Sequence, residues 1–182
     1  MTSTPEDAEL VARAQRGDVG AFGVLYQRYY KVIYRYLRSR LSEDPVAEDM
    51  TAAVFLRSFE ALDSYRERGW PFSAFLYRVA KNLLADHFRR KRPEVPFERA
   101  DLAATDSLDE RVVEEERTQV LRQALEALPR DYQEVIRLRV LLGLPTAMAA
   151  TWLGRSEGAT RVLLSRALER LRQEVLRDGE PK

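Results

Sequence analysis

The sequence TWLGRSEGATRVLLSRAL, residues 151–168, decides how the second half of this chain folds. Gly154 and Ser156 separate a short apolar stretch from a longer one in which leucine recurs at helical spacing, which predicts helices over residues 145–153 and 156–176. Two helices joined by a turn of three or four residues that contains glycine are typical of a helix-turn-helix, whose second helix can lie in a DNA major groove. A plain αα-hairpin inside a bundle gives the same pattern, so the stretch alone leaves both structures open.

The second of these helices is predicted to be two-faced. One face carries Thr160, Leu164, Ala167, Leu168, Leu171 and Val175. The opposite face carries Gly158, Val162, Ser165, Arg166 and Glu169, with Arg161 on the flank. Ser156 can cap the helix and leave its N-terminus free to meet a phosphate, while Ala149 and Ala150 let the preceding helix approach closely.

The composition of the whole chain excludes several classes of protein. Its 182 residues include no cysteine and one histidine, His87, which argues against disulfides, thiolate chemistry, a structural zinc site and a catalytic triad. We therefore expect no enzyme, no cofactor and no metal, and we interpret Asp86 beside His87 as a surface pair. No apolar run approaches the roughly 20 residues that cross a bilayer, and the start MTSTPEDAEL is acidic, so we expect a cytoplasmic protein without membrane contact.

Glycine, proline and capping residues divide the rest of the chain into further helices. Thr4 and Gly17 bound a first helix, Asp18 caps a second, and Ser42 is the predicted N-cap of a third. A fourth is expected over residues 71–91, a fifth from residue 107 or 109 to 128, and a sixth from 129 to 142. No segment alternates as a strand does, so the predicted fold is all-α.

The fourth helix and the loop before it combine basic and aromatic side chains. The predicted core face comprises Phe72, Phe75, Leu76, Val79, Ala80, Leu83, Leu84 and Phe88. The polar face comprises Arg78, Lys81, Asn82, Asp86 and Arg89. Such a surface suits single-stranded nucleic acid, because bases stack on aromatic rings while cations hold the backbone. Since Phe72 and Phe75 belong to the core, Tyr65 and Trp70 in the loop are the candidates for stacking.

Charge is distributed in three blocks. Residues 1–92 contain 16 Lys/Arg against 12 Asp/Glu, residues 93–117 contain 3 against 9, and residues 118–182 contain 11 against 8. Solvated surface could account for this imbalance, but two basic modules that face a polyanion would account for it too. We predict two helical domains, residues 1–92 and 107–182, joined by an extended acidic linker, residues 93–106.

The order of several segments resembles the extracytoplasmic-function (ECF) group of bacterial RNA polymerase sigma factors. The segments are LYQRYYKVIYRYLRSRL, AEDMTAAVFLRSFEAL, PFSAFLYRVAKNLLADHFRRKR, ALPRDYQEVIRLRVLLGL and LGRSEGATRVLLSRALERLR. The likeness covers residues 8–176. It implies that the first domain is sigma region two, that the second is sigma region four, and that the protein gives RNA polymerase its promoter specificity.

The resemblance also assigns residues to partners. Binding to the clamp helices of the polymerase beta-prime subunit is implied for Glu48, Asp49, Thr51, Phe55, Leu56 and Arg57. Capture of the melted minus-10 element is implied for Tyr65, Trp70, Arg78, Lys81, Asn82, Arg89 and Arg90. Recognition of the minus-35 duplex is implied for Arg155, Ser156, Glu157, Arg161, Ser165 and Arg166. The beta flap and an anti-sigma factor are further candidate partners, and the free protein is expected to be a monomer.

Three positions depart from the usual pattern of that family. Ala52 and Ala53 stand where a Gln-Glu pair is common, Met148 begins a triplet that usually reads Glu-Ile-Ala, and Leu163 occupies a position that is often basic. The alternative function is a stand-alone helix-turn-helix regulator that dimerises, against which two unlike modules and the lack of an evident dimer helix argue.

Overall fold

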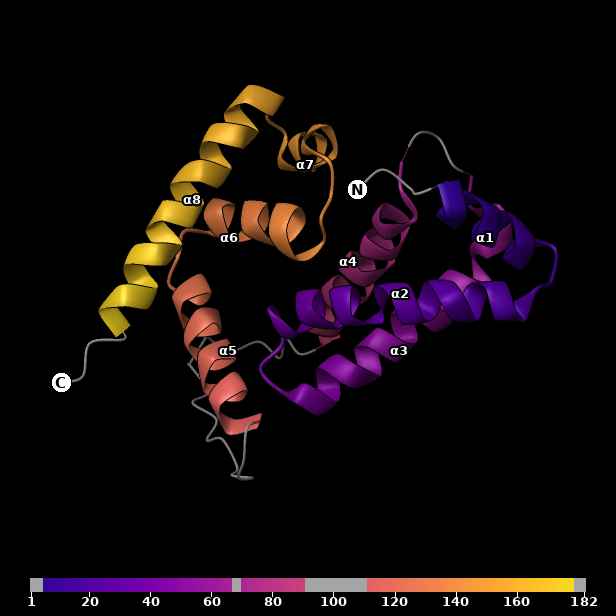
Figure 1. The fold of residues 1–182 in the computed structure, drawn as a ribbon, viewed down its shortest axis with the longest axis horizontal. Coiled ribbons are helices and arrows are strands. Elements are labelled where there is room, and N and C mark those ends of the chain that lie inside the picture. Colours follow the sequence, from indigo (N-terminus) through magenta and orange to yellow (C-terminus); the bar gives the residue numbers. More distant parts are fainter. Residues whose placement is uncertain (1–4, 67–69, 91–110, 179–182) are drawn as a thin grey trace. The chain divides into compact units, whose positions relative to one another are not determined.

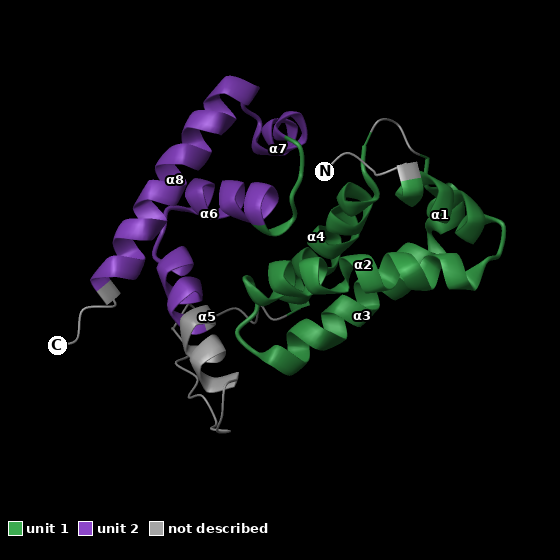
Figure 2. Ribbon diagram, in the orientation of Figure 1, with its two compact units in different colours: residues 1–98, 141–145 green, residues 99–140, 146–182 purple. Residues whose placement is uncertain are grey.

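The computed structural model describes residues 5–66, 70–90 and 111–178, and within these ranges it consists of helices and their connections, with no strand. The prediction of an all-α fold is confirmed. The chain forms two compact units, residues 1–98 with 141–145 and residues 99–140 with 146–182 (Figure 2). The predicted acidic linker, residues 93–106, and the predicted caps Thr4, Ser107 and Asp109 lie outside the described residues.

The described part of unit 1 contains four α-helices and one short 3₁₀ turn (Figure 1). They are α1 (Pro5–Gln15), α2 (Val19–Arg38), α3 (Asp44–Glu60), the turn η1 (Leu62–Ser64) and α4 (Phe72–Arg90). Helix α2 packs against α1, α3 and α4, and α3 packs against α4. The interior includes an edge-to-face pair of rings, Tyr36 and Tyr77, with centroids 5.3 Å apart.

The start of α2 follows the sequence signal, whereas the start of α3 does not. The Asp18 carboxylate accepts a hydrogen bond of 3.1 Å from the Ala21 amide, which confirms the predicted cap. Helix α3 instead begins after Glu43, without a side-chain cap, so the prediction of Ser42 as N-cap is wrong. If Ser42 were the cap, Pro45 would be the third helical residue, and proline has no amide hydrogen for the serine to bind.

Helix α4 buries most of the face predicted for it. Phe72, Phe75, Leu76, Ala80 and Leu84 are buried, and Val79 and Leu83 are half-buried. Phe88 was predicted to be core but is 47% exposed. It lines an open pocket together with Leu41, Ser42 and Val46, because the last turn of α4 faces the connection between α2 and α3 and is only partly covered.

Among its described residues, unit 2 contains four α-helices and a π-helical turn whose last residue, Leu141, is counted with unit 1 (Figure 1). They are α5 (Arg111–Glu126), α6 (Arg130–Ile136), the π turn η2 (Arg137–Leu141), α7 (Thr146–Leu153) and α8 (Glu157–Asp178). Helix α8 packs against α5, α6 and α7. One core cluster joins them through Leu125, Leu128, Val135, Ile136 and Ala167, with Tyr132, Leu153, Leu163, Leu164 and Leu171 packed against it.

The π turn changes the face predicted for the sixth helix. The predicted helix over residues 129–142 is α6 followed by η2, and Val140, predicted to be apolar core, is 53% exposed. A π turn takes up more residues per turn than an α-helix, so the buried face shifts in register. Arg137 is buried in this turn, while Val135, Ile136, Leu138 and Leu142 keep the predicted burial.

Candidate nucleic-acid interface

The turn between α7 and α8 has the helix-turn-helix geometry that the opening stretch predicts. Gly154 has φ +64°, a conformation that costs glycine little, and the Arg155 amide donates to the Ala150 carbonyl across 3.0 Å to end α7. Ser156 caps α8, since its Oγ accepts from the Ala159 amide at 3.2 Å. The exposed first turn of α8 therefore presents backbone amides in the way that phosphate-binding helices do.

The two faces of α8 are the predicted ones, with a single exception. Thr160 and Ala167 are fully buried, and the outward residues Gly158, Val162, Ser165, Arg166 and Glu169 are all exposed. Leu168 was predicted to face the core but is exposed. It lies about 100° of helix rotation from Ala167, at the edge of the buried stripe.

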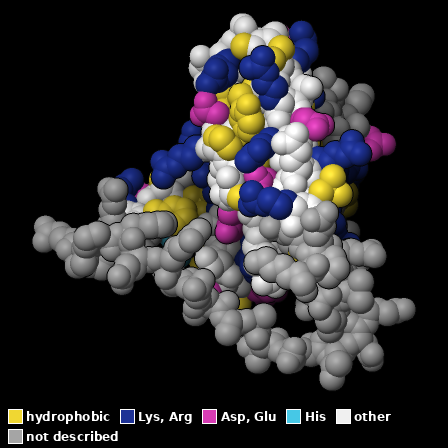
Figure 3. All heavy atoms as spheres, turned by 90° about the vertical axis from the view of Figure 1, so that its left-hand side faces the viewer, with side chains coloured by type: hydrophobic (Ala, Val, Ile, Leu, Met, Phe, Trp, Pro, Cys, Tyr) yellow, Lys and Arg dark blue, Asp and Glu magenta, His cyan; other side chains and the backbone are white. Residues whose placement is uncertain are grey.

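Two arginines of this region are held by carboxylates. Arg161 pairs with Glu157 one turn earlier on α8 at 3.1 Å, and Arg155 pairs with Asp131 of α6. Exposed pairs of this kind contribute only a few tenths of a kcal/mol. Arg161 can therefore exchange its carboxylate for a phosphate or a guanine at little cost. Figure 3 shows the side of the molecule on which α8 lies, where Lys and Arg side chains are interspersed with hydrophobic and acidic ones.

In the loop before α4, Tyr65 is engaged by the protein and Trp70 is exposed. The Tyr65 ring packs on Phe75 at 4.9 Å and on Phe72 at 5.8 Å, and its hydroxyl donates to the Trp70 carbonyl at 3.2 Å. Tyr65 thus links the two sides of the loop, and because its ring is only half-buried its stacking on a base stays a prediction. Trp70 is the loop aromatic that presents its surface to solvent.

A glutamine that sequence reasoning missed anchors this loop. The side-chain amide of Gln15, the last residue of α1, donates to the carbonyls of Leu62 and Tyr65, both at 2.9 Å. These bonds span 47 and 50 residues of sequence, so no local pattern could have revealed them. Gln15 links the position of the loop to the position of α1.

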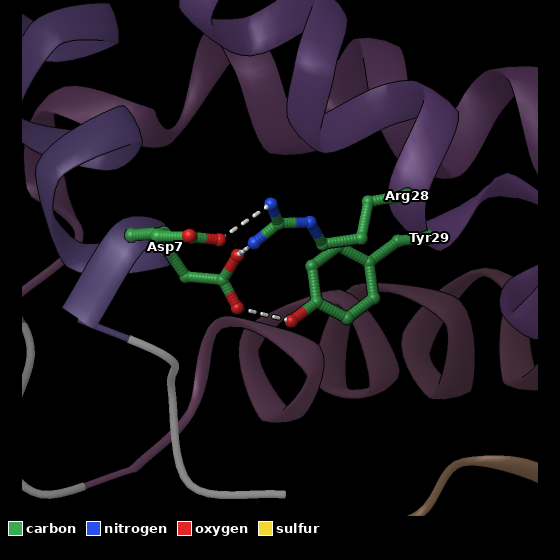
Figure 4. A network of polar contacts seen from close by, with 4 residues as sticks. Asp7, Arg28 and Tyr29 are labelled. Atoms are coloured by element: carbon green, nitrogen blue, oxygen red, sulfur yellow. Dashed lines mark hydrogen bonds and ion pairs between the residues drawn. The ribbon is translucent and has the colours of Figure 1, made fainter.

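Helix α1 is in turn fixed to α2 by a buried carboxylate (Figure 4). Asp7 accepts hydrogen bonds from the Arg28 guanidinium and the Tyr29 hydroxyl, and Glu6 pairs with Arg28 at 3.2 Å. Burial and the hydrogen bond to Asp7 raise the pKa of Tyr29. A buried carboxylate without partners would be costly, so these bonds determine how α1 sits on α2.

The polar face of α4 is exposed as predicted except at Asp86, which is half-buried. Arg78, Lys81, Asn82, Arg89 and Arg90 are all accessible. Arg78 lies over the Phe75 ring at 5.9 Å, and Arg89 pairs with Asp86 at 3.2 Å. Asp86 thus pairs with an arginine of the same helix, and its pairing with the neighbouring His87 stays a prediction.

Helix α3 exposes four of the six residues that the resemblance assigns to the clamp dock. Glu48, Asp49, Leu56 and Arg57 are accessible. Thr51 and Phe55 are buried and cannot touch a partner in this conformation, which revises the predicted dock. Thr51 donates to the Ala47 carbonyl of the same helix at 2.7 Å, whereas the Phe55 ring packs 4.7 Å from that of Tyr26 and so ties α3 to α2.

A row of tyrosines on α2 lies beside this surface and was not singled out from the sequence. Tyr26 and Tyr30 lie 5.4 Å apart, and Tyr30 and Tyr34 stack at 6.2 Å. Burial, together with Tyr26 and Glu48, raises the pKa of Tyr30, which places the row next to the acidic part of α3. The spacing of four residues was the available signal, because it puts the three rings on one face.

A metal cluster and a membrane span are both absent from the described residues. Among them, no three His, Cys, Asp or Glu side chains are grouped so that they could hold a metal ion. None of their helices is both long enough and apolar enough to cross a membrane.

Comparison with known proteins agrees with these two units. Residues 25–94 match the family described as Sigma-70 region 2, and residues 118–171 match Sigma-70, region 4. Together the two matches define a sigma factor of the sigma-70 type. The chain belongs to the ECF RNA polymerase sigma factors, which confirms the predicted resemblance.

Two curated relatives and one solved structure illustrate the similarity. The ECF sigma factor BldN of Streptomyces coelicolor is 35% identical over 167 residues, which are 90% of this chain and 63% of BldN. SigD of Mycobacterium tuberculosis is 32% identical over 179 residues, 94% of this chain and 84% of SigD. CnrH, solved in complex with the cytosolic domain of CnrY, has a TM-score of 0.69 and 26% identity, over 96% of this chain and 99% of that chain.

Proposed function

We propose that this protein binds core RNA polymerase and directs it to a set of promoters, and that it has no catalytic activity of its own. The observation that carries the proposal is the presence of both sigma regions in one chain, the second of them with a capped helix whose outward face is exposed. A factor that acts with polymerase functions in the cytoplasm. The proposed domains are residues 1–92 and 107–182, with residues 93–106 as the linker.

In this proposal α8 reads the minus-35 duplex. Arg155, Ser156, Glu157, Arg161, Ser165 and Arg166 are the proposed contacts, and all six are exposed. Phosphate contacts from the helix N-terminus and the arginines set the register, and side chains that reach the base edges specify the sequence.

Unit 1 is proposed to capture the melted minus-10 strand. Trp70 stacks on an unpaired base, and the α4 residues Arg78, Lys81, Asn82, Arg89 and Arg90 hold the backbone. Tyr65 and Gln15 shape the loop. Stacking on Trp70 offsets part of the few kcal/mol that unstacking a base costs.

The polymerase dock is proposed on the exposed part of α3. Glu48, Asp49, Leu56 and Arg57 contact the clamp helices of the beta-prime subunit, while Thr51 and Phe55 hold α3 in place. Region four is proposed to contact the beta flap. Because CnrH is solved with the cytosolic domain of CnrY, a protein that sequesters this chain is a further proposed partner.

Run-off transcription tests the proposal. Core polymerase supplemented with the purified chain is expected to initiate at discrete genomic promoters, and core polymerase alone is not. The stand-alone regulator makes the opposite prediction: it would protect specific DNA without polymerase and would not give new start sites.

A further inference from the structure

The outward face of α8 contains an apolar side chain close to the helix-turn-helix turn, Val162, that none of the proposed contacts includes. Val162 is 51% exposed, and at about 100° of rotation per residue it lies about 150° from the centre of the buried stripe of Thr160 and Ala167. Its neighbour Leu163 has turned inward and packs against the core cluster of unit 2. Of two adjacent aliphatic residues, one therefore stabilises the fold and the other faces solvent.

The surroundings of Val162 leave room for a close approach. Gly158, one turn earlier, has no side chain, and a Cβ placed there would meet nothing within 4 Å. Ser165 and Arg166 flank Val162 on the next turn, and Arg161 is drawn to the side by its pair with Glu157. Val162 is thus central on the outward face and is flanked by polar groups.

We infer that Val162 reads the 5-methyl group of a thymine in the major groove of the minus-35 element, an inference that rests on the proposed function of α8. Thymine is the base whose major-groove edge carries a methyl group, and aliphatic side chains contact it. Valine can neither donate nor accept a hydrogen bond, so it would desolvate the polar edge of any other base without compensation. Val162 favours thymine both by attraction and by this penalty.

Valine is suited to this task because its rotamer is fixed. A β-branched side chain has one strongly preferred χ1 in a helix, so little conformational entropy is lost when the DNA closes on it. The contact would add one base preference to those set by Arg161 and Arg166.

Deoxyuridine substitution tests the contact directly, because uracil differs from thymine only by that methyl group. With the holoenzyme of core polymerase and the full chain, each thymine of the footprinted minus-35 element is replaced singly by deoxyuridine, and the dissociation constant of the promoter complex is measured. We expect one position at which the substitution weakens binding about fourfold, the factor that burial of one methyl group gives. With Val162→Ala, uracil and thymine are expected to bind equally at that position.

Two variants serve as controls. Val140→Ala removes an equally exposed valine of unit 2 from the π turn, at 53% exposure, and should leave the fourfold difference intact. Val162→Thr keeps the shape and one methyl group but adds a hydroxyl, and should relax the discrimination against other bases.

Three results would overturn the inference. In the first, no thymine of the minus-35 element gives weaker promoter binding when it is replaced by deoxyuridine. In the second, Val162→Ala still binds the deoxyuridine promoter more weakly than the thymine promoter, and in the third, Val140→Ala abolishes that difference as well. Failure of the proposed function looks different, because the wild-type holoenzyme would then show no promoter preference on any of these templates.

Discussion

Replacement of Gln15 by alanine should impair DNA melting without impairing recognition of duplex DNA. Gln15 donates two hydrogen bonds of 2.9 Å to carbonyls of the loop that precedes α4. Both carbonyls keep another donor in the variant, since Leu62 also accepts from the Tyr65 amide and Tyr65 also accepts from Arg66. Neither carbonyl is left without a donor, so the variant loses two ordinary hydrogen bonds of about 0.5–1.5 kcal/mol each. The free energy that holds the loop in this conformation should therefore fall by about 1–3 kcal/mol.

That cost should be visible only on promoters that must be melted. At about 1.4 kcal/mol per factor of ten, open-complex formation on a duplex promoter should fall about tenfold, whereas binding to a template with a premelted minus-10 bubble should fall much less. Permanganate reactivity of thymines in the bubble region measures the open complex. Gln15→Glu, which keeps the size but sets a carboxylate against the two carbonyl oxygens, should impair open-complex formation at least as much as Gln15→Ala, and the exposed Gln27→Ala serves as the control.

Equal losses on duplex and premelted templates would refute the reasoning. The two bonds would then contribute to the stability of unit 1 as a whole, and the loop would not depend on them. A loss in Gln27→Ala as large as that in Gln15→Ala would also refute it, because Gln27 is exposed on α2 and no loop contact is assigned to it.

Three further predictions concern the other surfaces. Tyr29→Phe removes the hydroxyl that binds Asp7 and should lower the free energy of unfolding by about 1 kcal/mol. Because folding raises the pKa of Tyr29, the wild type should keep this contribution below pH 10 and lose it at higher pH. Denaturant unfolding at several alkaline pH values should therefore show a free energy of unfolding that falls less steeply with pH in the variant than in the wild type. Joint replacement of the exposed Asp49 and Arg57 by alanine should weaken co-purification with core polymerase while circular dichroism stays unchanged, and undiminished co-purification would move the dock elsewhere. Arg161→Ala should weaken promoter binding by about 1–3 kcal/mol and relax the base preference at one minus-35 base pair. An equal loss of affinity for all minus-35 sequences, with the slope of log affinity against log salt concentration smaller by about one unit, would instead indicate a phosphate contact.

The local signals in the sequence predicted most of the fold because the interactions that produce them are also local. Asp18 and Ser156 cap helices through bonds to residues three positions away, and Gly154 takes the left-handed conformation that a helix end requires. The predictions of burial that were wrong depend on tertiary structure. Phe88 is exposed because the last turn of α4 is only partly covered by neighbouring residues, and Val140 is exposed because a π turn shifts the helical register.

The sequence predicted the exposed charged residues of the candidate site but not the residues that hold them in position. The cationic face of α4 and the outward face of α8 follow from helical periodicity alone. The engagement of Tyr65, the burial of Phe55 and the anchoring role of Gln15 arise from contacts between residues distant in sequence. Leu163 is the clearest case, since a departure from the family pattern is explained once it is seen to pack on the core.

Genomic footprinting with and without core polymerase tests the central claim most directly. The isolated chain is expected to bind duplex DNA weakly and with no preferred sequence. The complex with core polymerase is expected to protect discrete promoters and to melt the DNA near the start site. Tight, site-specific protection by the isolated chain, unchanged when core polymerase is added, would contradict the assignment of this chain as a promoter-specificity subunit.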